Sequence, residues 1–104
     1  MQAALEFVFR AGGSPRNGYP SIVASSPNAC ILHYTENRRR MEDGDLLLID
    51  AGCEYGYHTA DITRTFPVNG RFTEPQRVIY ELVLRAQRAG IAAARPGARY
   101  EAVH

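Results

Sequence analysis

The fold of this chain is decided by residues 46–72, which read LLLIDAGCEYGYHTADITRTFPVNGRF. The run Leu46–Ile49 is apolar at every position, as expected of a strand that is buried on both faces. The dipeptide Tyr55-Gly56 is turn-prone, and the residues on both sides of it are able to extend. The stretch therefore predicts a β-hairpin, and a turn centred between Tyr55 and Gly56 places Asp50 directly opposite Asp61.

Two directly opposed aspartates have Cβ atoms about 4.5–5.5 Å apart on one face of the hairpin, so their charges repel. A shared proton, an arginine or a cation would offset this repulsion. Because Asp50 ends an apolar run and should be partly buried, leaving its charge unpaired would be costly. Oxygen ligands favour a hard divalent cation, and a carboxylate that bridges two ions about 3.5–4 Å apart would meet the need. A second interpretation stays open, in which the register differs and one aspartate is a turn or capping residue.

The segments before the hairpin contain weaker signals. Gln2–Arg10 fits either a strand or an amphipathic helix, and short strands are predicted at Ser21–Ala24 and Ala29–Tyr34. The loop Gly12–Gly18 contains glycines but lacks the Gly-Lys-Ser/Thr ending of a phosphate-binding loop. This part of the chain therefore indicates strands and loops without a nucleotide site.

The clearest helix signal lies after the hairpin. Thr73 and Gln76 have the spacing of a capping box, and Pro75 fits the first turn, where its missing N–H costs little. The helix should run from Glu74 to Arg95, and its single apolar stripe should pack into a core. A further helix is expected to begin at Ala98. Because helices and strands do not alternate along the chain, the pattern indicates the α+β class.

Composition and charge limit the function classes. The formal net charge over 104 residues is +1, and acidic residues surround the only basic run, Arg38-Arg39-Arg40, so neither nucleic acid nor an anionic membrane surface is an expected partner. There is no signal-peptide pattern and no apolar run long enough to cross a bilayer. The two cysteines, Cys30 and Cys53, do not suggest a disulfide framework. We therefore expect a cytoplasmic protein.

From the residues alone, neither of the two histidines near these motifs is expected to be catalytic or to bind the metal. A catalytic pair of Cys30 and His33 is disfavoured, because residues three apart in the predicted strand point to opposite faces. By itself, His33 is more typical of a hydrogen-bonded structural histidine at a strand-to-loop corner. His58 would lie on the opposite strand face from Asp61, so it is not an expected ligand of the same metal.

Four blocks of sequence, in the same order, resemble aminopeptidase P, the Xaa-Pro aminopeptidase family. The blocks are Tyr19–Ala24, Asn28–Asn37, Leu48–Tyr57 and Thr59–Thr73. Prolidases share the two-aspartate hairpin, but His-Tyr-Thr-Glu-Asn at 33–37 and Ile-Thr-Arg-Thr-Phe-Pro at 62–67 are more similar to aminopeptidase P. The resemblance covers nearly the whole chain.

The resemblance implies a fold and a cofactor. Residues 1–104 would be the N-terminal part of a pita-bread catalytic domain, as in creatinase and methionine aminopeptidase, with the C-terminal half missing. The family holds two divalent metal ions, commonly manganese, through two aspartates, one histidine and two glutamates. Asp50 and Asp61 match the aspartates, and Asp61 is expected to bridge the metals. The other three ligands should lie beyond His104.

Three more residues match positions near the family's active site. His33 matches a catalytic histidine that contacts the substrate near the scissile bond and stabilises the developing charge. Tyr19 and Thr63 match residues that we expect to hydrogen-bond the metal-binding side chains. The metal pair would activate a water molecule for attack on the carbonyl that precedes a prolyl nitrogen.

The function implied by the resemblance is a metal-dependent aminopeptidase that releases the N-terminal residue from peptides with proline in the second position. The partner is the peptide substrate, and the full-length enzyme is expected to be a homo-oligomer. The chain alone should be inactive, because it lacks three expected ligands. Alternatives are an Xaa-Pro dipeptidase (prolidase), a metal-free hydrolase like creatinase, and a non-catalytic pita-bread binding module. Retention of both aspartates argues against the last two.

Overall fold

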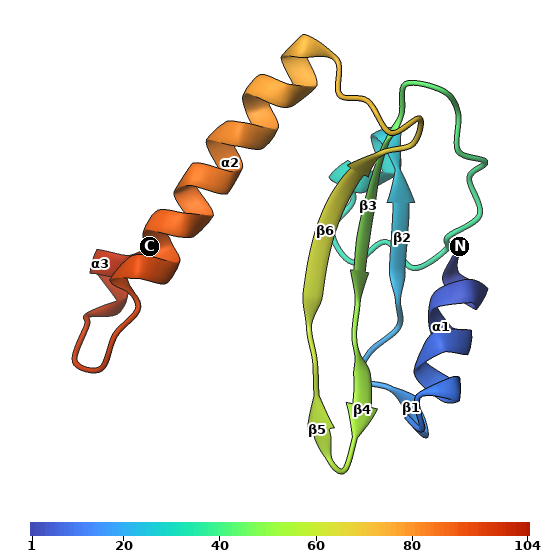
Figure 1. Cartoon of the computed structure of the whole chain (residues 1–104), viewed down its shortest axis with the longest axis horizontal. Helices are drawn as coiled ribbons and strands as arrows, with labels where there is room; N and C mark the ends of the chain where they lie inside the picture. Colours follow the sequence, from blue (N-terminus) through green and yellow to red (C-terminus); the bar gives the residue numbers. More distant parts are fainter. The chain divides into compact units, whose positions relative to one another are not determined.

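The computed structural model describes all 104 residues, which form two compact units, Met1–Arg71 and Phe72–His104. The second unit contains helices α2 (Glu74–Ala93) and α3 (Tyr100–Val103). The first unit contains, in chain order, α1 (Gln2–Ala11), β1 (Arg16–Asn17), β2 (Ile22–Ser25), the 3₁₀ helix η1 (Ser26–Cys30), β3 (Leu46–Ala51), β4 (Cys53–Tyr55), β5 (His58–Thr59) and β6 (Ile62–Pro67) (Figure 1). This content confirms the predicted α+β class.

One long antiparallel hairpin organises the first unit (Figure 1). One arm is formed by β3 and β4, the other by β5 and β6, and a single register runs through both, with Asp50 opposite Thr63 and Glu54 opposite Thr59. β2 pairs with β3 in the sheet β2-β3-β6, and β1 pairs with β4 in the sheet β1-β4-β5. The predicted hairpin is therefore confirmed as an element.

The hairpin turn lies one residue later than predicted. Gly56 and Tyr57 form the two-residue loop, with φ angles of 55° and 66°. Positive φ at both central residues is the requirement of a type I′ turn, whose twist matches that of the strands it joins. The Tyr57 N–H also donates a 2.6 Å hydrogen bond to Glu54 Oε1. Because the turn centre moves by one residue, the prediction that Asp50 directly faces Asp61 is wrong.

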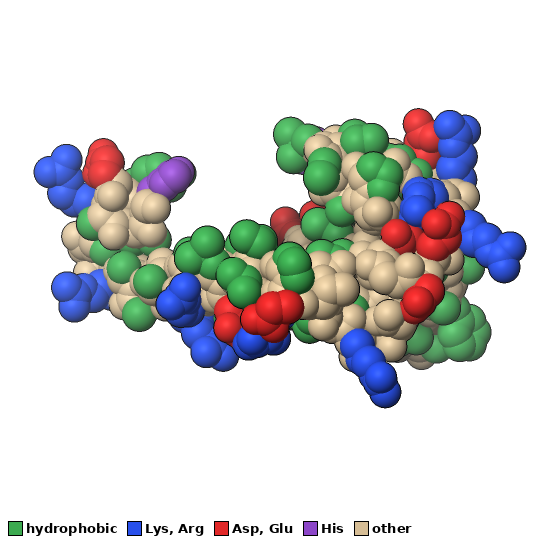
Figure 2. Space-filling view, turned by 90° about the horizontal axis from the view of Figure 1, so that it is seen from above, with side chains coloured by type: hydrophobic (Ala, Val, Ile, Leu, Met, Phe, Trp, Pro, Cys, Tyr) green, Lys and Arg blue, Asp and Glu red, His purple; other side chains and the backbone are tan.

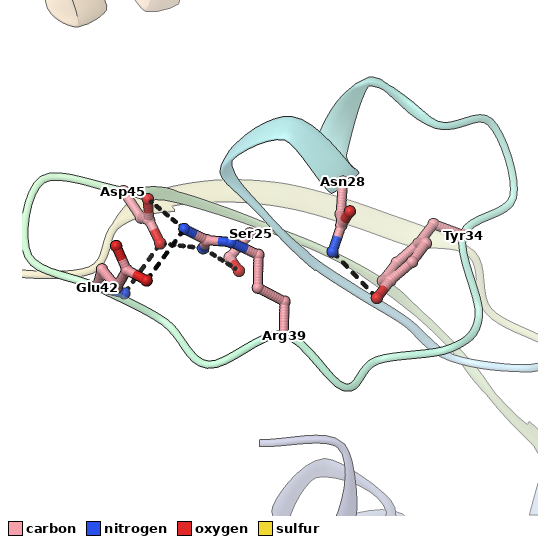
Figure 3. A network of polar contacts seen from close by, with 6 residues as sticks. All are labelled: Ser25, Asn28, Tyr34, Arg39, Glu42 and Asp45. Carbon is pink, nitrogen blue, oxygen red and sulfur yellow. Dashed lines mark hydrogen bonds and ion pairs between the residues drawn. The ribbon is translucent and has the colours of Figure 1, made fainter.

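The predicted strand Ala29–Tyr34 is also wrong. The chain leaves β2 at Ser26, whose φ is 52°, and enters η1 with Pro27 in the first turn. Pro27 has a fixed φ and no N–H for a sheet ladder, so it favours the helical turn that carries the chain away from the sheet. Further on, Tyr34 is buried, and its hydroxyl accepts a 3.0 Å hydrogen bond from Asn28 Nδ2 (Figure 3).

The core of the first unit is small and centred on β2. It consists of Ile22, Ala24 and Tyr34, with Ala29 and Leu48 partly buried against them. The strand predicted at Leu46–Ile49 is confirmed within β3, although Leu47 is the only one of these four residues that is buried, and the other three are half-buried. The first unit therefore relies on polar contacts as well as on apolar burial.

The ambiguous segment Gln2–Arg10 is helical and forms most of α1, which buries no residue completely. Polar side chains join it to the strands. The Glu6 carboxylate accepts hydrogen bonds from Asn17 Nδ2 at 2.8 Å and from Ser21 Oγ at 3.1 Å. A hydrogen bond from Gln2 Nε2 is the main reason that the pKa of Glu6 is lowered.

The second unit confirms the capping box. Gln76 Oε1 accepts from the Thr73 N–H at 2.9 Å, and Thr73 Oγ1 accepts from the Gln76 N–H. α2 ends at Ala93, two residues before the predicted Arg95. Four residues of its apolar stripe are at least half exposed in this chain: Val78, Ile79, Leu82 and Val83. Hydrophobic side chains are visible on the molecular surface in Figure 2. No helix combines the length and apolar character needed to span a membrane.

Candidate metal-binding site

Asp50 and Asp61 lie on the same face of the long hairpin. Asp50 is in β3, opposite Thr63, and Asp61 lies in the short gap between β5 and β6. Because side chains alternate between the two faces of extended chain, Asp61 shares the face of Thr63 and therefore that of Asp50. The aspartates form a diagonal pair, a relation in which residues are about 7–8 Å apart rather than in direct opposition. The hairpin thus brings the two carboxylates together by a different register from the predicted one.

The Tyr19 hydroxyl lies between these carboxylates. It is 2.5 Å from Asp50 Oδ1 and 3.2 Å from Asp61 Oδ1. Burial, followed by the hydrogen bond and charge of Asp50 and then those of Asp61, raises the pKa of Tyr19. The hydroxyl therefore stays protonated and neutral, and its one hydrogen serves one carboxylate at a time.

The backbone beside the aspartates requires glycine at position 52. A Cβ atom on Gly52 would lie 1.7 Å from the carbonyl oxygen of Ala60, the residue before Asp61. The Gly52 carbonyl in turn accepts a 2.9 Å hydrogen bond from the Gly18 N–H, next to Tyr19. One glycine thus allows the close approach of the strand that carries Asp61 and also anchors the loop that carries Tyr19.

No arginine or histidine forms an ion pair with Asp50 or Asp61. Of the three ways to offset their repulsion, this chain does not supply an arginine, so a shared proton and a cation remain, and the neutral Tyr19 phenol leaves both charges in place. Carboxylate oxygens that converge without a cationic side chain suit a hard divalent cation. The chain contains no group of three or more His, Cys, Asp and Glu residues able to hold a metal. The carboxylate pair therefore fits part of a metal site, not a complete one.

Thr63 and His33 have different surroundings. Thr63 lies directly opposite Asp50, but its hydroxyl makes no hydrogen bond, so its predicted contact with a metal-binding side chain stays a prediction. His33 is exposed in the turn after η1, with φ at 56°, and its ring makes no hydrogen bond with the rest of the chain. The hydrogen-bonded structural role considered for His33 therefore has no support in this structure.

The remaining histidine candidates do not form sites in this chain. Cys30 lies in η1 and not in the predicted strand, and no hydrogen bond joins it to His33. His58 Nδ1 lies 3.0 Å from the Gly56 carbonyl oxygen, so the ring belongs to the hairpin turn.

The roles of Gly52 and Gly18 were not predicted from the sequence. A glycine inside a strand pattern often marks a close backbone approach, and that signal was available at Gly52. The contact between Gly18 and Gly52 has no comparable local signal, because the two residues are far apart in the chain.

The amino-acid sequence is similar to those of curated Xaa-Pro aminopeptidases. The Xaa-Pro aminopeptidase of Haemophilus influenzae is 66% identical over 79 residues, which cover 76% of this chain and 18% of the relative. The Xaa-Pro aminopeptidase of Escherichia coli is 50% identical over 97 residues, which cover 93% of this chain and 22% of the relative. The chain thus spans only a small part of the curated relatives that it matches.

Solved structures give the same result. The aminopeptidase PepP of Pseudomonas aeruginosa has a TM-score of 0.95 and 54% identity, covering 98% of this chain and 23% of that one. A zinc-substituted Escherichia coli aminopeptidase P in complex with product has a TM-score of 0.87 and 51% identity, covering 92% and 23% of the two chains. The fold is therefore the N-terminal part of the pita-bread fold, as expected. The model of metallopeptidase family M24 matches residues 1–104, and this chain belongs to that family.

Proposed function

We propose that residues 1–104 form the N-terminal part of the catalytic domain of an Xaa-Pro aminopeptidase and supply two of its five metal ligands. One observation carries the proposal: Asp50 and Asp61 converge on the Tyr19 hydroxyl from the two arms of the hairpin, and no cationic side chain of this chain offsets their charge. The other ligands, a histidine and two glutamates, would come from residues beyond this segment. The enzyme would release the N-terminal residue from peptides with proline in the second position.

The proposed cofactor is a pair of divalent ions, with manganese as the metal. Carboxylate oxygens suit Mn²⁺, and the related aminopeptidase P of Escherichia coli has been solved in a zinc-substituted form. When bound, the metal pair would supply an activated water for peptide hydrolysis. Asp61 would bridge the two ions and Asp50 would hold one of them. Tyr19 would orient the Asp50 carboxylate by the hydrogen bond seen here.

His33 is the residue that we propose to contact the substrate. Its exposed ring has no partner within the chain, so both ring nitrogens are available to a peptide. Near the scissile bond, an imidazole N–H would donate to the oxygen on which negative charge develops. Thr63, opposite Asp50, would support the metal-binding carboxylate from the neighbouring strand.

The completed enzyme, meaning a protein in which these residues are joined to the rest of the catalytic domain, is the form to test. We expect it to release the first residue from an Xaa-Pro tripeptide and from longer Xaa-Pro peptides, to lose this activity with a chelator, and to regain it with manganese. Cleavage of Xaa-Pro dipeptides alone would identify a prolidase. Metal-independent hydrolysis would point to a creatinase-like enzyme, and substrate binding without cleavage to a binding module.

Two further properties are part of the proposal. The cytoplasm is the proposed compartment, supported by two cysteines that are both unpaired. A homo-oligomer is the proposed state of the completed enzyme, and sedimentation of the purified protein would measure it.

A further inference from the structure

The side chain of Asn37 closes part of an open sheet edge. β2 is the outermost strand in the order β2-β3-β6, so one edge of it lacks a neighbouring strand. At that edge, the Val23 N–H donates to Asn37 Oδ1 at 2.8 Å, and Asn37 Nδ2 donates to the Ser21 carbonyl at 2.7 Å. One carboxamide thus makes the two hydrogen bonds that another strand would make with these backbone groups.

Asparagine suits this position in two ways. Its φ is 51°, in the left-handed region that asparagine tolerates better than most residues. Its second N–H donates to Gln2 Oε1 at 2.8 Å, so all three hydrogen bonds are at normal length. An aspartate of the same shape is unable to donate, and its oxygen would face the acceptors of Ser21 and Gln2.

Asn37 ends the short segment that begins at His33. Both terminal residues are left-handed, with φ of 56° at His33 and 51° at Asn37. Contacts on either side of Asn37 hold the neighbouring chain (Figure 3): Asn28 Nδ2 donates to the Tyr34 hydroxyl, and Arg39 contacts both Ser25 Oγ, at 3.0 Å, and the Asp45 carboxylate. The segment is therefore held by its anchors and not by the His33 ring, which makes no hydrogen bond.

The anchor of Asn37 is also close to the candidate metal site in the sheet. Ser21 and Val23 flank Ile22, and Ile22 lies directly opposite Asp50 in the ladder between β2 and β3. Asn37 thus links the segment that carries His33 to the strand position that faces Asp50. A loss of this link would leave the metal-binding carboxylates in place and remove one of the anchors of the segment, so that the His33 end is held by Tyr34 alone.

We propose that Asn37 is a positioning residue, which holds His33 at a set distance from the metal site by bonding to the open edge of β2. This inference rests on the proposed function, in which His33 contacts the substrate. It adds a residue that touches neither metal nor substrate and acts through His33.

A double-mutant cycle in the completed enzyme tests the inference. We expect Asn37→Gly, which keeps the left-handed backbone accessible, to lower kcat by about 10- to 100-fold, because a displacement of roughly 1 Å is that costly. In a His33→Ala background, the same change should alter kcat by no more than about twofold. Asn37→Asp should behave like Asn37→Gly. Metal stoichiometry should stay unchanged in every variant.

The matched control is Asn69→Gly. Asn69 also uses both ends of its amide, donating to Asp43 Oδ1 at 2.8 Å and accepting from the Arg71 N–H at 3.0 Å, but it lies in the turn after β6. Its substitution should leave kcat unchanged in both backgrounds.

Two results would overturn the inference in distinguishable ways. Equal losses from Asn37→Gly with and without His33 would show that Asn37 acts elsewhere, while the proposed function stands. Unchanged kcat in His33→Ala would refute the proposed role of His33, and the inference with it. If the Asn37 variants do not fold, hydrogen exchange of the unmodified enzyme tests whether Asn37 is bonded to the edge of β2. The Val23 amide should be protected, and exchange at the rate of an open edge would contradict the anchor.

Discussion

At the scale of single residues, the two aspartates share one phenolic hydrogen. Tyr19 donates to Asp50 at 2.5 Å and remains 3.2 Å from Asp61, so Asp61 has the weaker partner within the chain. Charge repulsion between diagonal carboxylates is smaller than between directly opposed ones, because the separation is larger. A bound cation would therefore stabilise the charge of Asp61 more than that of Asp50.

The substitution Asp61→Asn in the completed enzyme should have opposite effects with and without metal. The amide keeps the shape but has only one ligand oxygen, so at least one metal ion should be lost. The metal-free protein should be unchanged or more stable by a few tenths of a kcal/mol, because the repulsion is gone. The metal-bound protein should lose the stabilisation that ligand binding gives the native state.

Thermal unfolding with chelator and with added manganese measures both effects, and elemental analysis measures the metal. Intact metal stoichiometry together with a less stable metal-free protein would show that Asp61 is a structural residue.

His33→Ala in the completed enzyme should lower kcat by roughly 10²–10³, the effect of removing one donor to a developing charge. Metal content should remain the same, because His33 is proposed to contact substrate only. Steady-state kinetics and metal analysis of the same preparation check this. Loss of both metals on this substitution would identify His33 as a ligand.

At the scale of structural elements, the geometry of the hairpin depends on one close contact. The Ala60 carbonyl occupies the space where a Cβ of residue 52 would be, and Ala60 directly precedes Asp61. The hairpin arms therefore leave no room for a side chain at position 52, beside the candidate metal site. The ladder is interrupted on both arms at this point, between β3 and β4 and between β5 and β6.

Gly52→Ala should lower the free energy of unfolding of the completed enzyme by about 1–3 kcal/mol, the usual cost of overpacking, and should weaken metal binding through displacement of Asp61. Gly90→Ala is the control. Its Cβ would meet only the Val103 carbonyl, at 3.6 Å, and alanine favours a helix over glycine by up to about 1 kcal/mol. Denaturant unfolding should therefore give opposite signs for the two variants, and equal effects would contradict the steric argument.

The start of α2 offers a separate test of local structure. Thr73→Ala removes the hydroxyl that accepts from the Gln76 N–H and should lower the free energy of unfolding of the completed enzyme by about 1 kcal/mol. Thr35→Ala, at an exposed residue outside any helix or strand, should have no such effect. Denaturant unfolding of both variants gives the comparison.

At the scale of the whole molecule, the chain has uncovered apolar surface and only part of a set of metal ligands. The stripe of α2 is exposed, and the strands carry two carboxylates without the additional ligands of a metal pair. Both deficits are expected of a chain that spans 18% to 22% of the relatives it matches in Haemophilus influenzae and Escherichia coli.

The isolated chain should therefore show no metal-dependent cleavage of an Xaa-Pro peptide, and it should bind manganese weakly. It should also associate as its concentration rises, because association would bury its exposed apolar stripe and pair the backbone groups of its open sheet edges. Peptidase assays, manganese titration and light scattering measure these properties. Cleavage that stops with chelator would refute the expectation.

The sequence was sufficient where a signal is local. The capping box at Thr73 and Gln76 gave the start of α2 correctly, because both residues satisfy backbone groups within one turn. The apolar run Leu46–Ile49 correctly predicted a strand in β3, because this signal also lies within a few consecutive residues. Where two local signals competed, prediction failed: Pro27 and the left-handed Ser26 turned the chain out of the sheet before the predicted strand at Ala29–Tyr34.

The hairpin shows why the site was partly predictable. A shift of the turn centre by one residue moves every cross-strand partner by two, and side chains in a strand repeat with a period of two. Asp50 and Asp61 therefore remained on one face although the predicted register was wrong. The turn type could not be predicted, because it required left-handed φ at Tyr57 as well as at Gly56.

By itself, the sequence determined the class of the fold, the beginning of α2, the existence of the hairpin and the common face of its two aspartates, since each follows from local patterns. Only the tertiary structure decided that Tyr19 reaches Asp50 and Asp61, which lie 31 and 42 residues further along the chain, and that Asn37 bonds to the edge of β2. Such contacts depend on the turn type, on the close approach at Gly52 and on which sheet edge is open. The partners in these contacts meet only when distant segments pack together, so no local pattern encodes which residues meet.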